Sequence, residues 1–399
     1  MDITIKPQKL DGTVNIIPSK SQAHRILICA AFSDSPTTLI CTETNQDIEA
    51  TADCLRALGA EITRTANGYL VNPIECIPNF AVLPCRESGS TLRFMLPVVG
   101  ALGVQATFKM EGRLPQRPLS PLWEEMTRMG CILSRPTNDT IHCTGRLKCG
   151  QYSIDGSVSS QFISGLLFAL PLIPGNSSLA ITGKIESKPY IEMTKDALTR
   201  FGVQAKYDTV YYSYPFQSPK TISIEGDWSN GAFFLTAQQL GCRLAVDNLN
   251  SESHQGDRAI IDILPLLKNG NVTVSAADIP DLVPIMSVAA AACKGATFTD
   301  IRRLRLKESD RVESTIAMIK SLGGMAEATE DTLTVYGTGL VGGTVDAVND
   351  HRIAMSAAIA ATVCRTPVTI LGAECVKKSY PQFWDEYSRL GGKYELYIR

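Results

Sequence analysis

The chain has 399 residues, of which 44% are hydrophobic and 20% are charged, a composition typical of globular proteins and unlike that of a disordered chain or a coiled coil. Its 38 lysines and arginines nearly balance 40 aspartates and glutamates, which argues against a partner, such as nucleic acid or an anionic membrane, that depends on a strong overall field. Only four histidines occur, so a histidine-rich zinc site is not expected.

The N-terminal segment MDITIKPQKL lacks an apolar core, so no signal peptide is expected, and no apolar run reaches the roughly 18 residues of a membrane span. The twelve cysteines are scattered without a CxxC motif, and several lie inside apolar runs. We therefore expect reduced, mostly buried thiols in a cytoplasmic protein, and neither disulfides nor metal ligands.

Six segments along the chain predict an amphipathic helix that ends at a glycine and is followed by a short strand. In five of them, apolar residues lie one and four positions before the glycine, which is the stripe of a helix closed by a glycine. Successive glycines are 71, 72, 68, 53 and 68 residues apart: Gly59, Gly130, Gly202, Gly270, Gly323 and Gly391.

A second set of six segments predicts helices that begin with polar residues and are then apolar on nearly every side, which indicates burial. Their starts are 69, 70, 69, 52 and 70 residues apart: Ser21, Ser90, Ser160, Ser229, Asp281 and His351. Both sets share the short fourth step, so the chain contains six related units of about 65 to 70 residues. We expect two α/β lobes of three units each, with a hinge near residue 226.

Four of these buried helices begin with hydroxyl or basic groups: Lys20-Ser21, Glu87–Ser90, Ser159–Gln161 and Asp350–Arg352. Unpaired N–H groups and the helix dipole stabilise an anion at a helix N-terminus. At any single site, ordinary helix capping is the simpler interpretation. The recurrence at four helices favours a cationic site for small ligands that carry phosphate or carboxylate.

The basic segment RRLRLKESDR, residues 302–311, has two interpretations. It is either a solvated edge strand that runs into a helix or a clamp for an anion, because guanidinium groups bind carboxylate and phosphate in a bidentate manner.

The motif GTGLVG, residues 337–342, is interpreted as a turn, because no apolar helix follows it. No P-loop, HExxH or GxSxG motif occurs.

Ten motifs, in order from residue 18 to residue 384, resemble the 5-enolpyruvylshikimate-3-phosphate (EPSP) synthase family. They are PSKSQAHR, SGSTLR, LPQRP, SVSSQF, SKPYIEMT, GDWSNGAFFL, the aspartate of DIPDL, LKESDR, NDHRIAM and KSYPQFW. The resemblance implies an α/β fold, a two-lobed inside-out α/β barrel with six βαβαββ units, three per lobe. One lobe would comprise residues 1–17 and 227–399 and the other residues 18–226, with the active site in the cleft between them.

The resemblance also implies a reaction. The enolpyruvyl group of phosphoenolpyruvate is transferred to the 5-hydroxyl of shikimate 3-phosphate, and phosphate is released, in the pathway to chorismate and the aromatic amino acids. No metal or organic cofactor is implied. The expected partners are these two small anions, with no nucleic acid and no membrane, and the expected state is a cytoplasmic monomer.

Roles carried over from the family's motifs concern both substrates and the proton transfers. Contacts to shikimate 3-phosphate are expected from Lys20, Ser21, Arg25, Ser159, Ser160, Gln161, Ser187, Asp281 and Lys307. Contacts to phosphoenolpyruvate are expected from Lys20, Gly89, Arg117, Gln161, Arg311, Arg352 and Lys378. Asp281 is expected to accept the 5-hydroxyl proton and Glu308 to donate a proton to C3, with Lys20 and Lys378 as further catalytic residues.

The chain departs from the family's pattern in the loop RESGST. Arg86 and Glu87 replace glycine and asparagine, Ser90 replaces threonine, and Glu87 needs a partner, for which Arg86 and Arg93 are candidates. Arg303 stands where asparagine is common, so no role is assigned to it.

Two alternative functions stay open. The first is enolpyruvyl transfer to UDP-N-acetylglucosamine on the same fold, which pairs lysine with asparagine where this chain has Lys20-Ser21, and usually has a cysteine where EGRLPQR has none. The second is a non-catalytic anion-binding protein, which would be expected to lack Asp281, Glu308 or Lys378.

Overall fold

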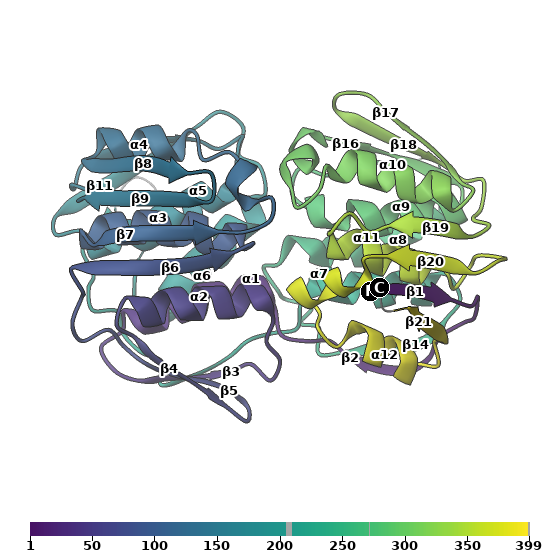
Figure 1. The fold of residues 1–399 in the computed structure, drawn as a ribbon, viewed down its shortest axis with the longest axis horizontal. Coiled ribbons are helices and arrows are strands. Elements are labelled where there is room, and N and C mark those ends of the chain that lie inside the picture. The colour runs from purple at the N-terminus through teal and green to yellow at the C-terminus, as the bar shows by residue number, and fades with distance from the viewer. Residues whose placement is uncertain (205–209, 271, 398–399) are drawn as a thin grey trace. The chain divides into compact units, whose positions relative to one another are not determined.

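The computed structural model describes residues 1–204, 210–270 and 272–397 (Figure 1). The chain forms two compact units. Unit 1 is discontinuous and consists of Met1–Ile17 and Gly226–Arg399, whereas unit 2 is the single segment Pro18–Glu225. Each unit has its own hydrophobic core.

Unit 2 contains three buried helices and three amphipathic helices. The buried helices are α1 (Lys20–Ala31), α3 (Gly89–Leu102) and α5 (Ser160–Ala169). The amphipathic helices are α2 (Gln46–Ala57), α4 (Leu122–Arg128) and α6 (Lys188–Arg200). Two short 3-10 helices, η1 (Leu114–Gln116) and η2 (Leu170–Leu172), complete the helical segments described for this unit.

Three sheets accompany the helices of unit 2, in the orders β13-β3-β5-β4, β6-β7-β9-β8 and β10-β11-β12. In each order the first two strands are parallel to each other, and the remaining neighbours are antiparallel. The strands are β3 (Thr37–Ile40), β4 (Glu61–Thr65), β5 (Gly68–Asn72), β6 (Phe80–Arg86), β7 (Gln105–Met110), β8 (Cys131–Thr137), β9 (Thr140–Gly145), β10 (Gln151–Asp155), β11 (Asn176–Thr182), β12 (Val210–Tyr211) and β13 (Thr221–Ser223).

Unit 1 repeats this design. Its buried helices are α7 (Trp228–Gln239), α9 (Val283–Ala292) and α11 (His351–Ala360). Its amphipathic helices are α8 (Ile260–Asn269), α10 (Arg311–Ser321) and α12 (Phe383–Arg389). The 3-10 helices are η3 (Gly256–Ala259), η4 (Pro280–Leu282), η5 (Arg302–Leu306) and η6 (Ala373–Lys378).

The sheets of unit 1 have the orders β14-β2, β15-β16-β18-β17 and β19-β20-β1-β21. The first strand of the chain thus lies in the interior of a sheet built from its last residues, where Ile3 pairs with both Ile370 and Leu396. The strands are β1 (Asp2–Ile5), β2 (Asp11–Asn15), β14 (Arg243–Asp247), β15 (Val272–Ser275), β16 (Gly295–Thr299), β17 (Met325–Ala328), β18 (Thr332–Tyr336), β19 (Gly343–Asp346), β20 (Val368–Leu371) and β21 (Tyr394–Tyr397).

The repeat predicted from the glycines is confirmed. All six glycines follow the predicted helices and have positive φ angles, from 74° at Gly202 to 113° at Gly130. At Gly323, for example, φ is 81°, and the next amide, that of Gly324, returns to the Ile319 carbonyl over 2.9 Å. A residue with a Cβ is strained in this conformation, which explains why glycine recurs at the end of each amphipathic helix.

One interpretation of the basic segment is wrong. Residues 302–306 form the 3-10 helix η5 and not an edge strand. Leu304 is buried whereas Leu306 is 45% exposed, so the alternation of arginine and leucine does not follow the two faces of a sheet. Residues 337–342 belong to no helix or strand, which confirms the predicted turn.

The predicted burial of the cysteines is also confirmed. All twelve cysteines are free thiols, and most of them are buried, including Cys29 and Cys143. Within the described residues, no helix is long and apolar enough to cross a membrane.

Candidate active site

In unit 2, two arginines converge on the first residue of helix α3. Ser88 is the N-cap of this helix, and its Oγ accepts a hydrogen bond from the Thr91 amide over 3.3 Å. Gly89 follows, and a Cβ at this position would lie 2.6 Å from Nη1 of both Arg93 and Arg117. Only a residue without a side chain lets both guanidinium groups approach the helix N-terminus, where an anion is favoured.

Arg93 connects the starts of two buried helices. Its Nη1 donates to Oε1 of Gln161 over 3.0 Å, its Nη2 donates to the Pro118 carbonyl over 3.1 Å, and its guanidinium lies over the Phe162 ring. The side-chain amide of Gln161 in turn donates from Nε2 to Oγ of Ser90 over 2.9 Å. The sequence indicated Arg93 only as a candidate partner for Glu87, and its link to Gln161 depends on the packing of α3 against α5.

Arg25 is buried in the same unit and is held by three partners. Its Nε donates to the Thr194 hydroxyl over 2.8 Å, and its two Nη atoms donate to the carbonyls of Ser21 and Tyr190 over 2.6 and 2.8 Å. Burial lowers the pKa of Arg25 to about 10, so the group is still a cation at neutral pH.

The three serines predicted to bind phosphate lie at the beginnings of α5 and α6. Ser159 is the N-cap of α5, and its hydroxyl accepts from the Gln161 amide over 3.3 Å. Ser160 is the first residue of α5, and Ser187 precedes α6 with a left-handed φ of 54°. The two helices pack against each other, so the structure places these hydroxyl groups in neighbouring elements.

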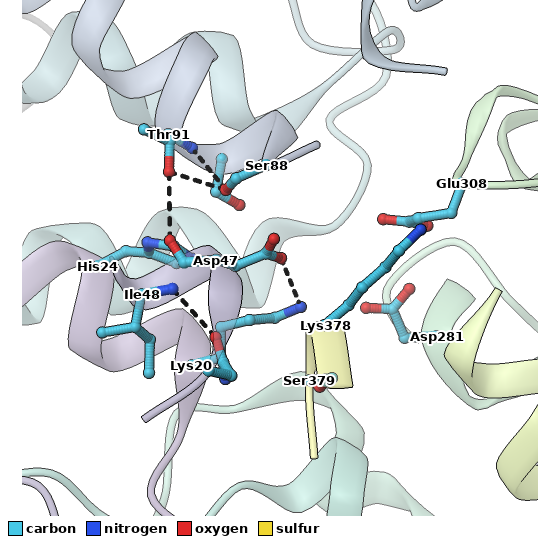
Figure 2. A network of polar contacts seen from close by, with 12 residues as sticks. Lys20, His24, Asp47, Ile48, Ser88, Thr91, Asp281, Glu308, Lys378 and Ser379 are labelled. Carbon is cyan, nitrogen blue, oxygen red and sulfur yellow. Dashed lines mark hydrogen bonds and ion pairs between the residues drawn. The ribbon is translucent and has the colours of Figure 1, made fainter. Parts of the chain in front are cut away.

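Lys20, the first residue of α1, forms an ion pair with Asp47 in the first turn of α2 (Figure 2). The Nζ and Oδ2 atoms are 3.0 Å apart, and both side chains are less than one-fifth exposed. Sequence reasoning missed Asp47, because no motif connects the two residues across 27 positions.

In unit 1, three cations surround the carboxylate of Asp281. Arg311 Nη1 donates to Oδ1 over 2.5 Å, Arg352 Nη2 donates to Oδ2 over 3.0 Å, and Lys307 Nζ lies 3.5 Å from Oδ1. Burial alone would raise the pKa of Asp281, but the charges of Arg352, Lys307 and Arg311 together hold it well below its usual value. Asp281 is therefore a carboxylate at neutral pH.

Arg311 is the centre of this cluster and is only 1% exposed. Besides Asp281, its guanidinium binds Oε2 of Glu308 over 2.6 Å and Oδ2 of Asp350 over 2.8 Å. Burial would lower the pKa of Arg311, but Asp350, Glu308 and Asp281 raise it well above its ordinary value. Asp350 also caps α11, where it accepts a hydrogen bond from the Arg352 amide over 3.0 Å.

The two lysines of the predicted site that lie in unit 1 differ in their surroundings. Lys378 is buried at the end of η6, and its Nζ donates to the Asn349 carbonyl over 2.9 Å. Lys307 follows η5, and burial, opposed by the charge of Asp281, lowers its pKa to about 8. Lys307 therefore loses its charge just above neutral pH.

A further carboxyl group, that of Asp257 in η3, was not found from the sequence. It is buried and accepts a hydrogen bond from the Ser229 hydroxyl in the first turn of α7. Burial and the charge of Asp281, against the opposing charge of Arg352, raise the pKa of Asp257 to about 7. Its hydrogen-bond partner Ser229 belongs to the recognised motif GDWSN, and the charges of Asp281 and Arg352 that act on it belong to the motifs DIPDL and NDHRIAM.

The loop RESGST, residues 86–91, departs from the family pattern, and its first residue contacts Asp53 of helix α2. Arg86, with a positive φ of 50°, donates to Oδ2 of Asp53 over 2.5 Å. The Glu87 carboxyl group lies against Gly112. Arg303 lies within η5.

Each unit thus presents buried cations and hydroxyl groups at the N-termini of its buried helices, and unit 1 adds a carboxylate that is held ionised. In the described part of the chain, no three His, Cys, Asp or Glu side chains are grouped so as to hold a metal ion. This arrangement defines an α/β protein whose buried cations and hydroxyl groups are suited to small anions.

Comparison with known proteins identifies the family. Residues 5–387 match the model of the EPSP synthase (3-phosphoshikimate 1-carboxyvinyltransferase) family, and the chain belongs to this family. It is 37% identical to the 3-phosphoshikimate 1-carboxyvinyltransferases of Clostridium kluyveri and Clostridium perfringens, with 98% of this chain aligned to 97% and 98% of theirs. The resemblance inferred from the motifs is confirmed, and with it the assignment to the transferases.

Solved structures confirm the predicted fold class. The chain is similar to two structures of EPSP synthase from Acinetobacter baumannii, each with a TM-score of 0.80. The identities are 22% and 20%, and the comparisons cover 99% and 100% of this chain and 100% of each of the others.

Proposed function

We propose that this chain transfers the enolpyruvyl group of phosphoenolpyruvate to the 5-hydroxyl group of shikimate 3-phosphate and releases phosphate. The observation that carries the proposal is the Asp281 carboxylate, which is kept ionised between Arg311, Arg352 and Lys307. Such a group can accept a proton from a hydroxyl, while the cations beside it serve anionic substrates.

For phosphoenolpyruvate, the proposal assigns cations and donors from both units. Arg117 reaches the N-terminus of α3 at Gly89, where backbone N–H groups are also available to an anion. The complete proposed set is Lys20, Gly89, Arg117, Gln161, Arg311, Arg352 and Lys378. The two arginines of this set in unit 1 already bind the carboxylate of Asp281, and guanidinium groups are suited to carboxylate and phosphate.

For shikimate 3-phosphate, the proposal assigns hydroxyl groups to the phosphate. Ser159, Ser160 and Ser187 begin helices α5 and α6, and Lys307 adds a positive charge. Lys20, Ser21, Arg25 and Gln161 contact the rest of the substrate, including its carboxylate, and Asp281 faces the reacting hydroxyl group.

The proposed mechanism has an addition step and an elimination step. In the addition, Asp281 accepts the 5-hydroxyl proton, the hydroxyl oxygen bonds to C2 of phosphoenolpyruvate, and Glu308 donates a proton to C3. In the elimination, C3 returns a proton to the Glu308 carboxylate left by the addition, and the bond from C2 to the phosphate oxygen breaks. Lys20 and Lys378 stabilise the negative charge that moves to the phosphate.

The proposal describes an enzyme that acts as a monomer in the cytoplasm and needs no cofactor, nucleic acid or membrane. Its support is the balanced composition of the chain, with a formal net charge of −2, and the resemblance of its motifs to the family.

A phosphate-release assay tests the reaction. The purified chain is given phosphoenolpyruvate alone, with shikimate 3-phosphate, with shikimate, or with UDP-N-acetylglucosamine. Release only with shikimate 3-phosphate is the expected result. Release with UDP-N-acetylglucosamine instead would identify the sister reaction, and binding of phosphoenolpyruvate without release in any mixture would identify a non-catalytic anion-binding protein.

A further inference from the structure

A buried row of side chains joins helices α1, α2 and α3 of unit 2, and none of its members has a role in the proposed reaction. His24 Nδ1 lies 2.7 Å from the Thr51 hydroxyl, which lies 2.7 Å from the Thr91 hydroxyl. Thr91 then donates to Oγ of Ser88 over 2.8 Å. All four residues are at most 1% exposed.

The hydrogen bonds of this row run in one direction. A threonine hydroxyl has one proton, and Thr91 uses its proton toward Ser88, so the Thr51 hydroxyl must donate to Thr91. Thr51 can then only accept from His24, which places a proton on Nδ1. Burial, together with the charges of Lys20 and Arg25, holds the pKa of His24 well below its usual value, so the ring is neutral and carries its single proton on Nδ1.

The row ends on two parts of the proposed phosphoenolpyruvate site, as Figure 2 shows around Thr91. Ser88 is the N-cap of α3, and Gly89 follows it. Thr91 also lies 3.5 Å from the Asp47 carbonyl, and the carboxylate of Asp47 holds Lys20 over 3.0 Å. Because the Thr91 proton is used toward Ser88, the row connects the first turn of α3 to α2 through Thr51, which lies four residues after Asp47 on that helix.

We propose that His24 and Thr51 are positioning residues for phosphoenolpyruvate, because their one-directional hydrogen-bond row fixes the N-terminus of α3 relative to the Lys20–Asp47 pair. The inference rests on the proposed function, which assigns Gly89 and Lys20 to that substrate. A displacement of about 1 Å in a binding or catalytic group is enough to reduce rates on the order of 100-fold, so positioning at this point has a measurable effect.

The first test compares two substitutions of Thr51. Thr51→Val keeps the shape of the side chain and removes the hydroxyl group, whereas Thr51→Ser keeps the hydroxyl group. We expect Thr51→Val to raise KM for phosphoenolpyruvate roughly tenfold and to leave KM for shikimate 3-phosphate nearly unchanged, because outer groups that orient binding residues typically contribute about 10- to 100-fold. Thr51→Ser should restore the wild-type value.

Thr236→Val is the matched control. Thr236 is also a fully buried helical threonine, on α7, and its hydroxyl has no hydrogen-bond partner among the described residues. This variant reports the general effect of replacing a buried threonine and should leave both KM values unchanged. Equal increases in both KM values in Thr51→Val, or unchanged kinetics with a lower melting temperature, would show a purely structural role and overturn the inference.

A second measurement does not depend on activity. Since the chain has only four histidines, ¹⁵N spectra of the wild-type protein can resolve His24, with His24→Asn providing the assignment. A neutral ring protonated on Nδ1 between about pH 6 and pH 8 supports the row, and a proton on Nε2 or a charged ring contradicts it. A wild-type chain that releases no phosphate would refute the proposed function, while this spectrum would still test the row itself.

Discussion

Arg311 donates a hydrogen bond from Nη1 to Oδ1 of Asp281 over 2.5 Å, and the same buried guanidinium group binds Glu308 over 2.6 Å. One cation thus holds both the carboxylate proposed as the base and the one proposed as the acid. Because Arg311 is 1% exposed, removal of either carboxylate would leave a buried charge less compensated, so the pair is expected to affect binding as well as proton transfer.

Asp281→Asn should therefore separate binding from catalysis. The amide keeps the shape of the side chain but cannot accept the hydroxyl proton, so kcat should fall by roughly 10²- to 10⁴-fold, the usual contribution of a general base. Arg352 and Arg311 then each lose one anionic contact, so the dissociation constant of phosphoenolpyruvate should be unchanged or smaller. Steady-state kinetics and calorimetric titration measure the two effects.

The control for this substitution is Asp247→Asn, which changes an exposed carboxylate at the end of β14 in the same unit. It should leave kcat and binding unchanged. A kcat in Asp281→Asn within a factor of two of wild type would exclude Asp281 as the base.

Loss of the Lys307 charge should lower kcat/KM for shikimate 3-phosphate on the alkaline side of its pH profile. Burial, opposed by the charge of Asp281, lowers the pKa of this lysine to about 8, so its positive charge is lost as the pH rises through 8. Since kcat/KM reports ionisations of the free enzyme, its value for shikimate 3-phosphate should fall above about pH 8. In Lys307→Arg, the guanidinium stays charged, and the alkaline limb should move up by at least one pH unit. An unchanged limb would assign the ionisation to another group.

Much of the fold can be predicted from the sequence, because the features that determine it lie close together along the chain. A glycine at the end of an amphipathic helix relieves a backbone restriction, and Gly130 and Gly202 have the positive φ angles that this explanation requires. The buried helices were equally predictable, because a helix that is apolar on every side must lie inside the protein. In contrast, the edge-strand interpretation of residues 302–306 relied on the basic composition of the segment, which does not distinguish a strand from a 3-10 helix.

The site was only partly predictable, and the motifs of the family contributed most of it. The partners that complete it were missed because they depend on tertiary packing. Asp47 contacts Lys20 only because α1 packs against α2. The pKa of Asp257 is raised by its burial and by the charge of Asp281. No spacing in the chain encodes such contacts, whereas a motif such as LKESDR places Arg311 and Glu308 three residues apart on the chain, where they form an ion pair.

Gly89→Ala should selectively weaken the binding of phosphoenolpyruvate. The added Cβ would lie 2.6 Å from Nη1 of both Arg93 and Arg117, so at least one guanidinium group has to move away from the helix N-terminus. We expect an increase of roughly 10- to 100-fold in KM for phosphoenolpyruvate, with a smaller change for shikimate 3-phosphate. Steady-state kinetics with each substrate varied in turn checks this, and equal changes for both substrates would contradict it.

Asp257 should make the stability of the protein depend on pH in the direction opposite to that of most carboxylates. Burial and the charge of Asp281 raise its pKa to about 7, so from about pH 4 to pH 7 the folded state holds a proton that the unfolded state releases. Its stabilising contribution is complete below about pH 4 and is lost as the pH rises through 7. Relative to Asp257→Asn, which does not titrate, the wild-type melting temperature should therefore decrease steadily over this range. A constant difference between the wild type and Asp257→Asn would show that Asp257 is ionised throughout.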